Sequence, residues 1–218
     1  MRVRLTMLCA TATEGSRDQV FGDGALSEHD RHELAAARAA LPPYARAVRT
    51  PSVRCAQLAE ALAVEATPES ALRDLDYGAW DGRPLEEIAA EDPYGLSSWL
   101  TDPDAAPHGG ESVRELCRRT ATWLDMLRGD TGSVLAITES TVVRAALVHV
   151  LSAPARAFWH LDVPSFSAVT LTMRDGGWNA RFGRLEVPQQ RPPADGSPHV
   201  AVLTIRSTRR HMCLTSRP

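Results

Sequence analysis

The feature that most constrains this fold is the alternation of short apolar segments with longer helical segments along the chain. Residues 2–9 alternate and then become apolar, and residues 133–138 form another short apolar run, as buried strands do. Residues 112–127 place apolar side chains at helical spacing, which predicts a long amphipathic helix. This alternation predicts an α/β fold: three layers, with a mostly parallel central sheet and helices on both faces.

Local start and stop signals place the remaining predicted elements. Ser27 is a suitable N-cap for a first helix, and Pro84 suits the first turn of a later one. Ligands of parallel sheets bind outside the carboxyl ends of the strands, so segments 8–13 and 138–141 are the predicted location of a site. The expected elements are helices at 26–41, 53–62, 84–90 and 141–151, a strand at 47–50, a loop at 101–111, and a hairpin of 168–173 with 179–185.

The domain organisation follows from length and from a change in composition. A chain of 218 residues is long enough for one domain with a sizeable core, and residues 1–187 contain the predicted elements. Residues 188–218 begin with a proline-rich run and hold five arginines but a single acid. We expect a flexible C-terminal tail there, with an edge strand at 200–205 as the alternative.

Charge and residue usage exclude several classes of function. A net charge of -3 gives no electrostatic case for nucleic acid. No apolar run approaches the roughly 20 residues that span a bilayer, and the N-terminus is too quickly polar for a signal peptide, so we expect a cytoplasmic protein. The four cysteines are widely spaced, which disfavours a zinc site or a disulfide framework. The chain also lacks lysine, which excludes a Schiff-base lysine.

Five segments occur in an order and at spacings typical of one known family. They are L-S-E-H-D-R at 26–31, T-P-S-V-R-C-A at 50–56, L-R-D-L-D-Y-G-A-W-D-G at 72–82, G-G-E-S at 109–112 and F-W-H-L at 158–161. Together they resemble the histidine phosphatase superfamily, and within it the phosphoglycerate mutase-like bacterial phosphatases. The resemblance covers about residues 2–187 and implies that fold, with no metal and no organic cofactor.

The resemblance also locates the positions at which the family carries its chemistry. The family motif L-V-R-H-G-E-T aligns with M-L-C-A-T-A-T, so the phosphate-binding arginine falls on Cys9 and the nucleophilic histidine on Ala10. The second family histidine falls on Glu139, and the proton-donating glutamate falls on Asp74. Among the core groups of the family's pocket, only one residue, Arg54, keeps the residue type of the family.

These replacements remove the implied phosphoryl-transfer chemistry. Alanine has no lone pair, so Ala10 cannot form a phosphoenzyme. Cysteine at position 9 and glutamate at position 139 take positive charge away and add negative charge, which disfavours binding of a phosphomonoester dianion. We expect Arg54 to pair instead with Glu139 or Asp74.

Two interpretations of the replacement residues stay open. Cys9 near Arg54 is either a nucleophile with a lowered pKa or, as we favour, a small buried residue at a strand end. Asp74 and Glu139 are either an acid/base pair with divided pKa values or, as we favour for Glu139, a neutralising partner of Arg54.

Four further residues complete the predicted ligand pocket. Thr11 and Ser140 offer hydroxyl groups after the two strand ends, although hydroxyls that cap helices are also common there. His108 and Glu111 lie in or beside the loop that approaches the pocket in relatives, and an exposed loop histidine is the alternative for His108. The tryptophans are expected to be core residues: Trp80, Trp99, Trp123 and Trp159.

The sequence therefore predicts a degenerate relative of this family, without phosphohistidine chemistry. It would bind an unknown small molecule, or act as a regulatory or accessory protein, with a homodimer as the oligomer to test for. The alternative is an enzyme of altered chemistry that uses Glu139 and Asp74 as acid and base on a non-phosphate substrate. A residual phosphomonoesterase is the least favoured reading, and the sequence leaves open whether the chain is an enzyme.

Overall fold

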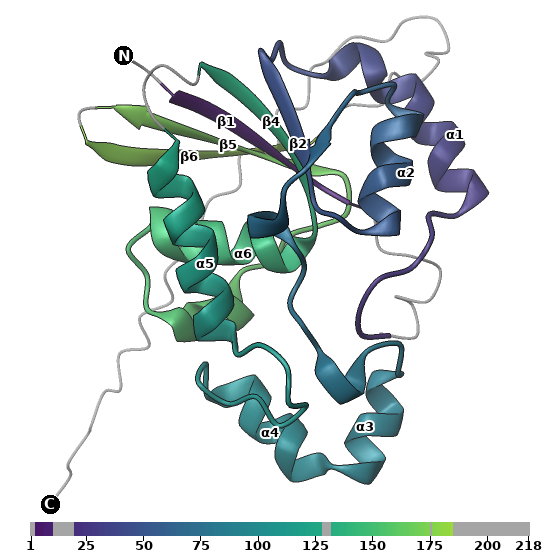
Figure 1. Ribbon diagram of the computed structural model, residues 1–218, viewed down its shortest axis with the longest axis vertical. Coiled ribbons are helices and arrows are strands. Elements are labelled where there is room, and N and C mark those ends of the chain that lie inside the picture. The colour runs from purple at the N-terminus through teal and green to yellow at the C-terminus, as the bar shows by residue number, and fades with distance from the viewer. Residues whose placement is uncertain (1–2, 11–19, 128–131, 175, 185–218) are drawn as a thin grey trace, which may run out of the picture. The chain divides into compact units, whose positions relative to one another are not determined.

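A central sheet organises the residues that the computed structural model describes, which are 3–10, 20–127, 132–174 and 176–184. Their strands form one sheet in the spatial order β3-β2-β4-β1-β5-β6 (Figure 1). The strands are β1 (Val3–Cys9), β2 (Arg46–Arg49), β3 (Thr67–Pro68), β4 (Ser133–Thr138), β5 (Ser167–Arg174) and β6 (Gly177–Arg184).

One strand of this sheet, β5, runs opposite to the other five. The strands β3, β2, β4 and β1 are parallel, whereas β5 is antiparallel to β1 and β6 is antiparallel to β5. Leu5 of β1 lies opposite Val134 of β4 and Leu171 of β5, so the middle of the sheet is apolar. The predicted α/β fold with a mostly parallel sheet is confirmed, and so is the C-terminal hairpin.

Helices pack on both faces of the sheet. Figure 1 shows α1 (Glu28–Ala37) beside α2 (Val53–Ala61), and α5 (Val113–Met126) beside α6 (Ser140–Val150). Alternate β1 residues divide between the two cores, as the period of a strand requires. Leu5 and Met7 share a cluster with Leu116 and Ala145, whereas Leu8 packs with residues of the other helix pair, Leu34 and Leu58.

Serine side chains start three of these helices. The helix α5 begins with a capping box, in which Ser112 and Glu115 satisfy each other's backbone N–H groups. Ser27 caps α1 as predicted, and Ser52 caps α2. Pro84 is the N-cap of α3 (Leu85–Glu91) rather than a first-turn residue, because its ψ of 143° is still extended.

The helix α4 (Pro93–Thr101) and the short strand β3 are absent from the sequence-based prediction. The segment of α4 contains proline, glycine and two serines, which lower its helix propensity. Tertiary packing stabilises it, because Leu96 and Trp99 are buried in the core while the Asp92 carboxylate accepts a hydrogen bond from the Gly95 N–H at 2.8 Å.

The carboxyl ends of β1, β2 and β4 meet at one edge of the sheet. The N–H of Ala10 donates to the Thr138 carbonyl at 2.7 Å, and the N–H of Thr50 donates to the Ile137 carbonyl at 2.9 Å. The Thr50 hydroxyl donates to the Leu72 carbonyl at 2.6 Å. These bonds bring four chain segments together at the edge where the sequence predicts a site.

Three further predictions concern the tryptophans, membrane-spanning helices and the C-terminal residues. Of the predicted core tryptophans, Trp80, Trp99 and Trp123 are buried and Trp159 is partly buried. No helix among the described ranges combines the length and apolar character that crossing a membrane requires. The predicted C-terminal tail, residues 188–218, lies outside the described residues, so its flexibility and an edge strand at 200–205 stay predictions.

Candidate functional site

Two buried residues, Cys9 and Ala10, lie where β1 ends. Ala10 is 5% exposed and belongs to the core cluster under α1 and α2, whereas Cys9 belongs to the cluster on the opposite face of the sheet. The methyl group of Ala10 carries neither a lone pair nor an exchangeable proton. This position therefore supplies no nucleophile.

An ion pair links Arg54 to Glu139 beside this strand end. Nη1 of Arg54 donates to Oε2 of Glu139 at 2.9 Å, and the two side chains are only 12% and 5% exposed. Nη2 of Arg54 donates to the Gly22 carbonyl at 3.2 Å. Arg54 lies in the first turn of α2 and Glu139 lies between β4 and α6. The predicted pairing of Arg54 with Glu139 is confirmed.

The start of α2 supplies two more hydrogen bonds to Glu139. The Ser52 hydroxyl donates to Oε1 at 2.8 Å, and the Cys55 thiol donates to the same oxygen at 3.4 Å. Burial raises the pKa of Cys55 well above its usual value, and the charge of Glu139 raises it further, so this group stays a thiol. Both carboxylate oxygens of Glu139 are thus engaged by the protein itself, which holds the ion pair in a fixed position.

Asp74 reaches the same site from the segment that follows Leu72. Its Oδ1 accepts hydrogen bonds from the Leu75 N–H at 2.8 Å and from the Thr141 hydroxyl. Burial, followed by the negative charge of Glu139, raises the pKa of Asp74 to about 7, although the hydrogen bonds and Arg54 oppose the change. At neutral pH this carboxyl group exchanges a proton readily, as an acid/base group must.

The structure contradicts the interpretation of Cys9 as an activated nucleophile. Burial raises the pKa of Cys9 to about 12, and the charge of Glu139 contributes in the same direction. The Cys9 thiol donates to the neighbouring carbonyl of Ala10 at 3.3 Å. The charge of Arg54 lowers this pKa, but by less than burial raises it. Cys9 is a neutral core residue.

A second cation, Arg144, influences the site and is missing from the predicted residues. Its charge lowers the pKa of Cys9 more than that of Arg54 does, and its Cζ lies 5.7 Å from the centre of the Phe158 ring. Arg144 follows Ser140 by four residues on α6, so helical spacing was the signal that could have found it. Two arginines thus face two carboxyl groups, and the site carries little net charge.

Glu111 takes part in a separate network and is bound by arginines. Its carboxylate pairs with Arg119 at 2.6 Å and with Arg73 at 3.1 Å, and Glu111 is 8% exposed. Arg119 also donates to the carbonyls of Ala71 at 2.8 Å and Arg73 at 3.0 Å. Glu111 therefore braces, through Arg119, the segment that carries Asp74.

The other predicted pocket residues have different surroundings. His108 is 3% exposed and is packed against aromatic rings, with ring centres 5.1 Å from Trp80 and 6.2 Å from Tyr77, so it is not an exposed loop residue. Burial lowers the pKa of His108, and its Nδ1 accepts from the Gly110 N–H at 3.0 Å. Ser140 starts α6, and Thr11 lies outside the described residues.

Two hydroxyl groups of the site were also missed by reasoning from sequence. Neither Ser52 nor Thr141 is among the predicted pocket residues, whereas their hydroxyls donate to Glu139 and Asp74 respectively. Their position directly after strand ends was the available signal. Within the described ranges, no three histidine, cysteine or acidic side chains come together as a metal-binding group.

Comparison with known proteins identifies relatives of this chain. Residues 7–183 match the family described as the histidine phosphatase superfamily (branch 1). The bifunctional protein Rv2228c of Mycobacterium tuberculosis is 34% identical over 113 residues, which cover 50% of this chain and 31% of that protein. Phosphoserine phosphatase 1 of Hydrogenobacter thermophilus is 24% identical over 136 residues, covering 60% of this chain and 64% of the relative. The matches thus span less than two thirds of either relative.

Solved structures share the fold over nearly their whole length. The alpha-ribazole phosphatase from Shigella flexneri has a TM-score of 0.74 at 16% identity, covering 88% of this chain and 100% of that one. The mycobacterial glucosyl-3-phosphoglycerate phosphatase Rv2419c has a TM-score of 0.69 at 21% identity, covering 83% of this chain and 97% of that one. Since the family match extends over well more than half of the sequence, the chain belongs to the histidine phosphatase superfamily, branch 1.

Proposed function

We propose that this chain is a degenerate histidine phosphatase that binds a neutral or cationic small molecule and does not run phosphohistidine chemistry. The observation that carries the proposal is the buried ion pair of Arg54 with Glu139 at 2.9 Å. It occupies Arg54, the one pocket group that keeps the residue type of the family. In this role the chain acts as a binding or accessory protein.

The missing nucleophile supports the first half of this proposal. Ala10 ends the strand on which the family resemblance places the attacking histidine, and the neighbouring thiol of Cys9 has a pKa of about 12. At neutral pH neither group can attack phosphorus. The names of the relatives describe phosphatases of phosphate esters, and that activity does not transfer to a site without the attacking group.

The electrostatics of the site support the second half. A phosphate dianion would have to displace Glu139 from Arg54, which would leave a buried carboxylate without its partner. Separating a buried pair in this way costs about 3–5 kcal/mol. A neutral or cationic ligand leaves the pair intact, and the carboxyl group of Asp74 offers it a hydrogen-bond acceptor and a proton.

Phosphatase assays on a restored variant test this proposal. The native chain and the variant Cys9→Arg/Ala10→His/Glu139→His are compared on p-nitrophenyl phosphate and on a panel of phosphorylated metabolites. We expect the native chain to be inert and the variant to release phosphate. The matched control adds Arg54→Ala to the variant and is expected to remove the gained activity, because no phosphate-binding cation from α2 then remains.

Two further measurements make the outcome decisive. Because Cys9 is a core residue, the double variant Ala10→His/Glu139→His is tested beside the triple one, and circular dichroism checks that each is folded. Phosphate release by the native chain that disappears in Arg54→Ala would overturn the proposal. Thermal shifts with neutral, cationic and singly phosphorylated compounds should show stabilisation of the native chain by the first two groups only.

A second function, acid/base catalysis on a non-phosphate substrate, is favoured by one observation. The pKa of Asp74 is raised to about 7, whereas Glu139 is held as a charged partner of Arg54. Two carboxyl groups in such different environments can divide the roles of acid and base. Turnover of a ligand found by thermal shift, with loss of turnover in both Glu139→Gln and Asp74→Asn, would select this function over simple binding.

A further inference from the structure

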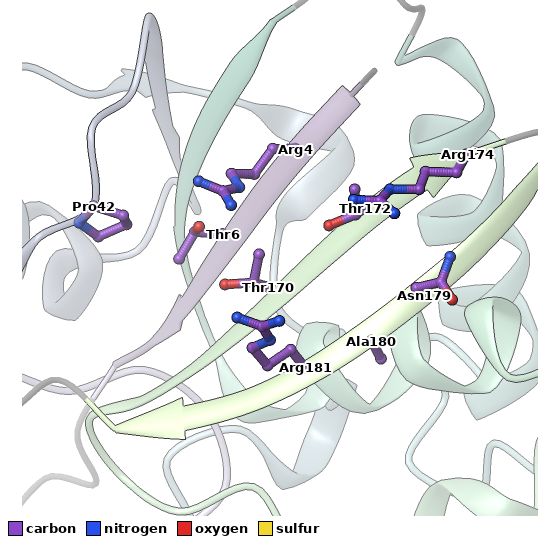
Figure 2. Close-up of a pocket in the computed structure, with 9 residues that line it drawn as sticks. All are labelled: Arg4, Thr6, Pro42, Thr170, Thr172, Arg174, Asn179, Ala180 and Arg181. Carbon is purple, nitrogen blue, oxygen red and sulfur yellow. The ribbon is translucent and has the colours of Figure 1, made fainter. Parts of the chain in front are cut away.

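A second polar surface lies on the part of the sheet that the helices leave open. Arg4 and Thr6 are on the same face of β1 as Leu8, which packs under α1 and α2. Towards β5 and β6, none of the described helices covers this face, and it forms a cavity of about 550 Å³ (Figure 2). It is separate from the pair of Arg54 and Glu139, neither of which lines it.

The strand register places the polar side chains of this cavity in two rows. Arg4, Thr172 and Asn179 lie opposite one another on β1, β5 and β6. Thr6, Thr170 and Arg181 form the next row on the same three strands. Neighbouring strands are about 4.8 Å apart and the two rows are about 7 Å apart, so Arg4 and Arg181 start roughly 12 Å apart, with threonine hydroxyls between them.

A third arginine extends this arrangement along β5. Arg174 lies two residues beyond Thr172 and therefore on the same face. In Figure 2 the Arg174 side chain extends towards Thr172, and the Arg181 side chain extends from β6 towards Thr170. The guanidinium groups thus approach the hydroxyl groups at the centre of the cavity from two sides.

The described residues that line this cavity carry charge of one sign. Among them are three arginines and no acidic residue. Within the described part of the chain, none of Arg4, Arg174 and Arg181 has a carboxylate partner. The chain as a whole has 27 acidic and 24 basic residues, so acids were available. A solvated sheet face explains polar residues, but surface charges normally alternate in sign.

We propose that this face is a binding site for a chain of two or three linked phosphate groups. Guanidinium groups bind phosphate oxygens in a bidentate manner, and three of them match the charge of an oligophosphate better than that of one phosphate. The threonine hydroxyls and the Asn179 amide supply neutral donors between the cations. The volume is within the range of small-molecule sites.

The lining residues also distinguish this ligand from two other candidates. Single-stranded nucleic acid is held by bases stacked on aromatic rings, and among the described residues no aromatic side chain lines the cavity. The exposed ring of Phe182 lies opposite Val169 and so belongs to the other face of the sheet. The second candidate is the chain's own segment 188–218, which carries five arginines and one acid. The three arginines of the cavity would repel a segment of the same charge.

Calorimetric titration of the full chain with tripolyphosphate tests the proposal. We expect measurable binding that weakens at least tenfold in Arg4→Gln/Arg174→Gln/Arg181→Gln and that weakens with added salt. The matched control removes the same charge from exposed arginines elsewhere, in Arg38→Gln/Arg118→Gln/Arg156→Gln, and should bind as the native chain does. All the substituted side chains are exposed, so both variants should keep the native melting temperature.

Several outcomes would overturn the proposal. These are absence of binding at millimolar tripolyphosphate, equal losses in the two triple variants, and loss of binding in Arg54→Ala with retention in the first triple variant. The last result would move the anion to the other site and contradict the proposed function as well, which separates the two failures. Tighter binding of an oligo(dT) strand than of tripolyphosphate would make the surface a nucleic-acid site instead.

The source of the phosphate chain is resolved by two further titrations. Pyrophosphate and ATP present the same linked phosphates without and with a nucleoside. Equal affinity for ATP and tripolyphosphate means that the site reads the phosphate chain alone. Tighter binding of ATP, again lost in the first triple variant, assigns the site to a nucleotide through that same phosphate chain.

Discussion

At the scale of single residues, the pair of Arg54 and Glu139 shows how one poorly exposed charge sets requirements on its neighbours. Each charge is buried, and each is tolerable only because the other is present. Ser52 completes the arrangement, because its hydroxyl both caps α2 and donates to Glu139. The pair is therefore a structural unit, and its members must be tested together.

A double-mutant cycle measures the coupling of this pair. We expect Glu139→Gln to lower the free energy of unfolding by about 3 kcal/mol, because it leaves the Arg54 charge buried without its partner. Arg54→Met should lower the free energy of unfolding by a similar amount, because it leaves the Glu139 charge buried without its partner. The double variant should lose clearly less than the sum of the two. Urea unfolding provides the values, and additive losses would show that the pair is not coupled.

Asp74 gives the folded protein a defined dependence on pH. Its pKa is raised from 3.8 to about 7, so the folded chain binds a proton that the unfolded chain releases between these values. Its contribution to stability is complete below pH 3.8 and is lost as pH rises through 7. Asp74→Asn removes this titration while keeping an oxygen that accepts from Thr141 and Leu75.

The corresponding measurement is urea unfolding of native and Asp74→Asn protein at pH 5 and pH 8.5. Relative to the native chain, the variant should gain about 1–3 kcal/mol between the two pH values, since three pKa units correspond to about 4 kcal/mol and relaxation reduces this figure. An identical difference in stability at both pH values would show that Asp74 has an ordinary pKa.

At the scale of elements, helix starts hold the site in place. The helices α2 and α6 begin at the strand ends where Ser52 and Glu139 lie, and α5 begins directly after the loop that contains Glu111. The N-termini of α2 and α5 are satisfied by the side chains of Ser52 and Ser112, whereas no side chain caps α6 at Glu139. The starts of α2 and α5 are thus set locally, before tertiary packing brings the three helix starts together.

The capping box of α5 provides a test at this scale. Ser112→Ala removes the acceptor for the Glu115 N–H and should lower the free energy of unfolding by about 1 kcal/mol. Ser97→Ala is the matched control, because Ser97 is exposed inside α4 and its replacement should change stability by less than about 0.5 kcal/mol. Equal effects of the two substitutions would argue against a capping role for Ser112.

At the scale of the whole molecule, Arg119 connects segments that are far apart in the sequence. From α5 it bonds the Glu111 carboxylate and the backbone carbonyls of Ala71, Arg73 and, at 3.4 Å, Asp74. One side chain thereby fixes the loop that carries Asp74 to the helix layer. The geometry of the candidate site depends on this distant brace.

Hydrogen exchange followed by mass spectrometry tests the brace. In Arg119→Met we expect faster exchange of the peptide covering residues 70–76, and no change in the peptide covering β4, which is held by sheet hydrogen bonds. Arg118→Met is the control, because the Arg118 side chain is 73% exposed and its ion pair with Glu115 spans 4.0 Å. Unchanged exchange at 70–76 in Arg119→Met would show that Arg119 does not hold this segment in place.

Much of the fold could be predicted because its signals are local. Apolar periodicity identified β1, β4 and α5 within a few residues, and caps such as Ser27 fixed where helices begin. The helix α4 could not be predicted, because burial of Leu96 and Trp99 by residues distant in sequence outweighs its weak propensity. The location of the candidate site at the carboxyl ends of the strands could be predicted from the parallel topology alone.

The sequence by itself determined the fold class, the family and the alanine at position 10, because these depend on residue identity and periodicity. Only the tertiary structure decided what the side chains around that strand end do. Burial, which no local pattern reports, made Cys9 a neutral core thiol and gave Asp74 a pKa of about 7. Strand register brought Arg4, Arg174 and Arg181 onto one open face, since hydrogen bonds between strands join residues that the chain keeps far apart.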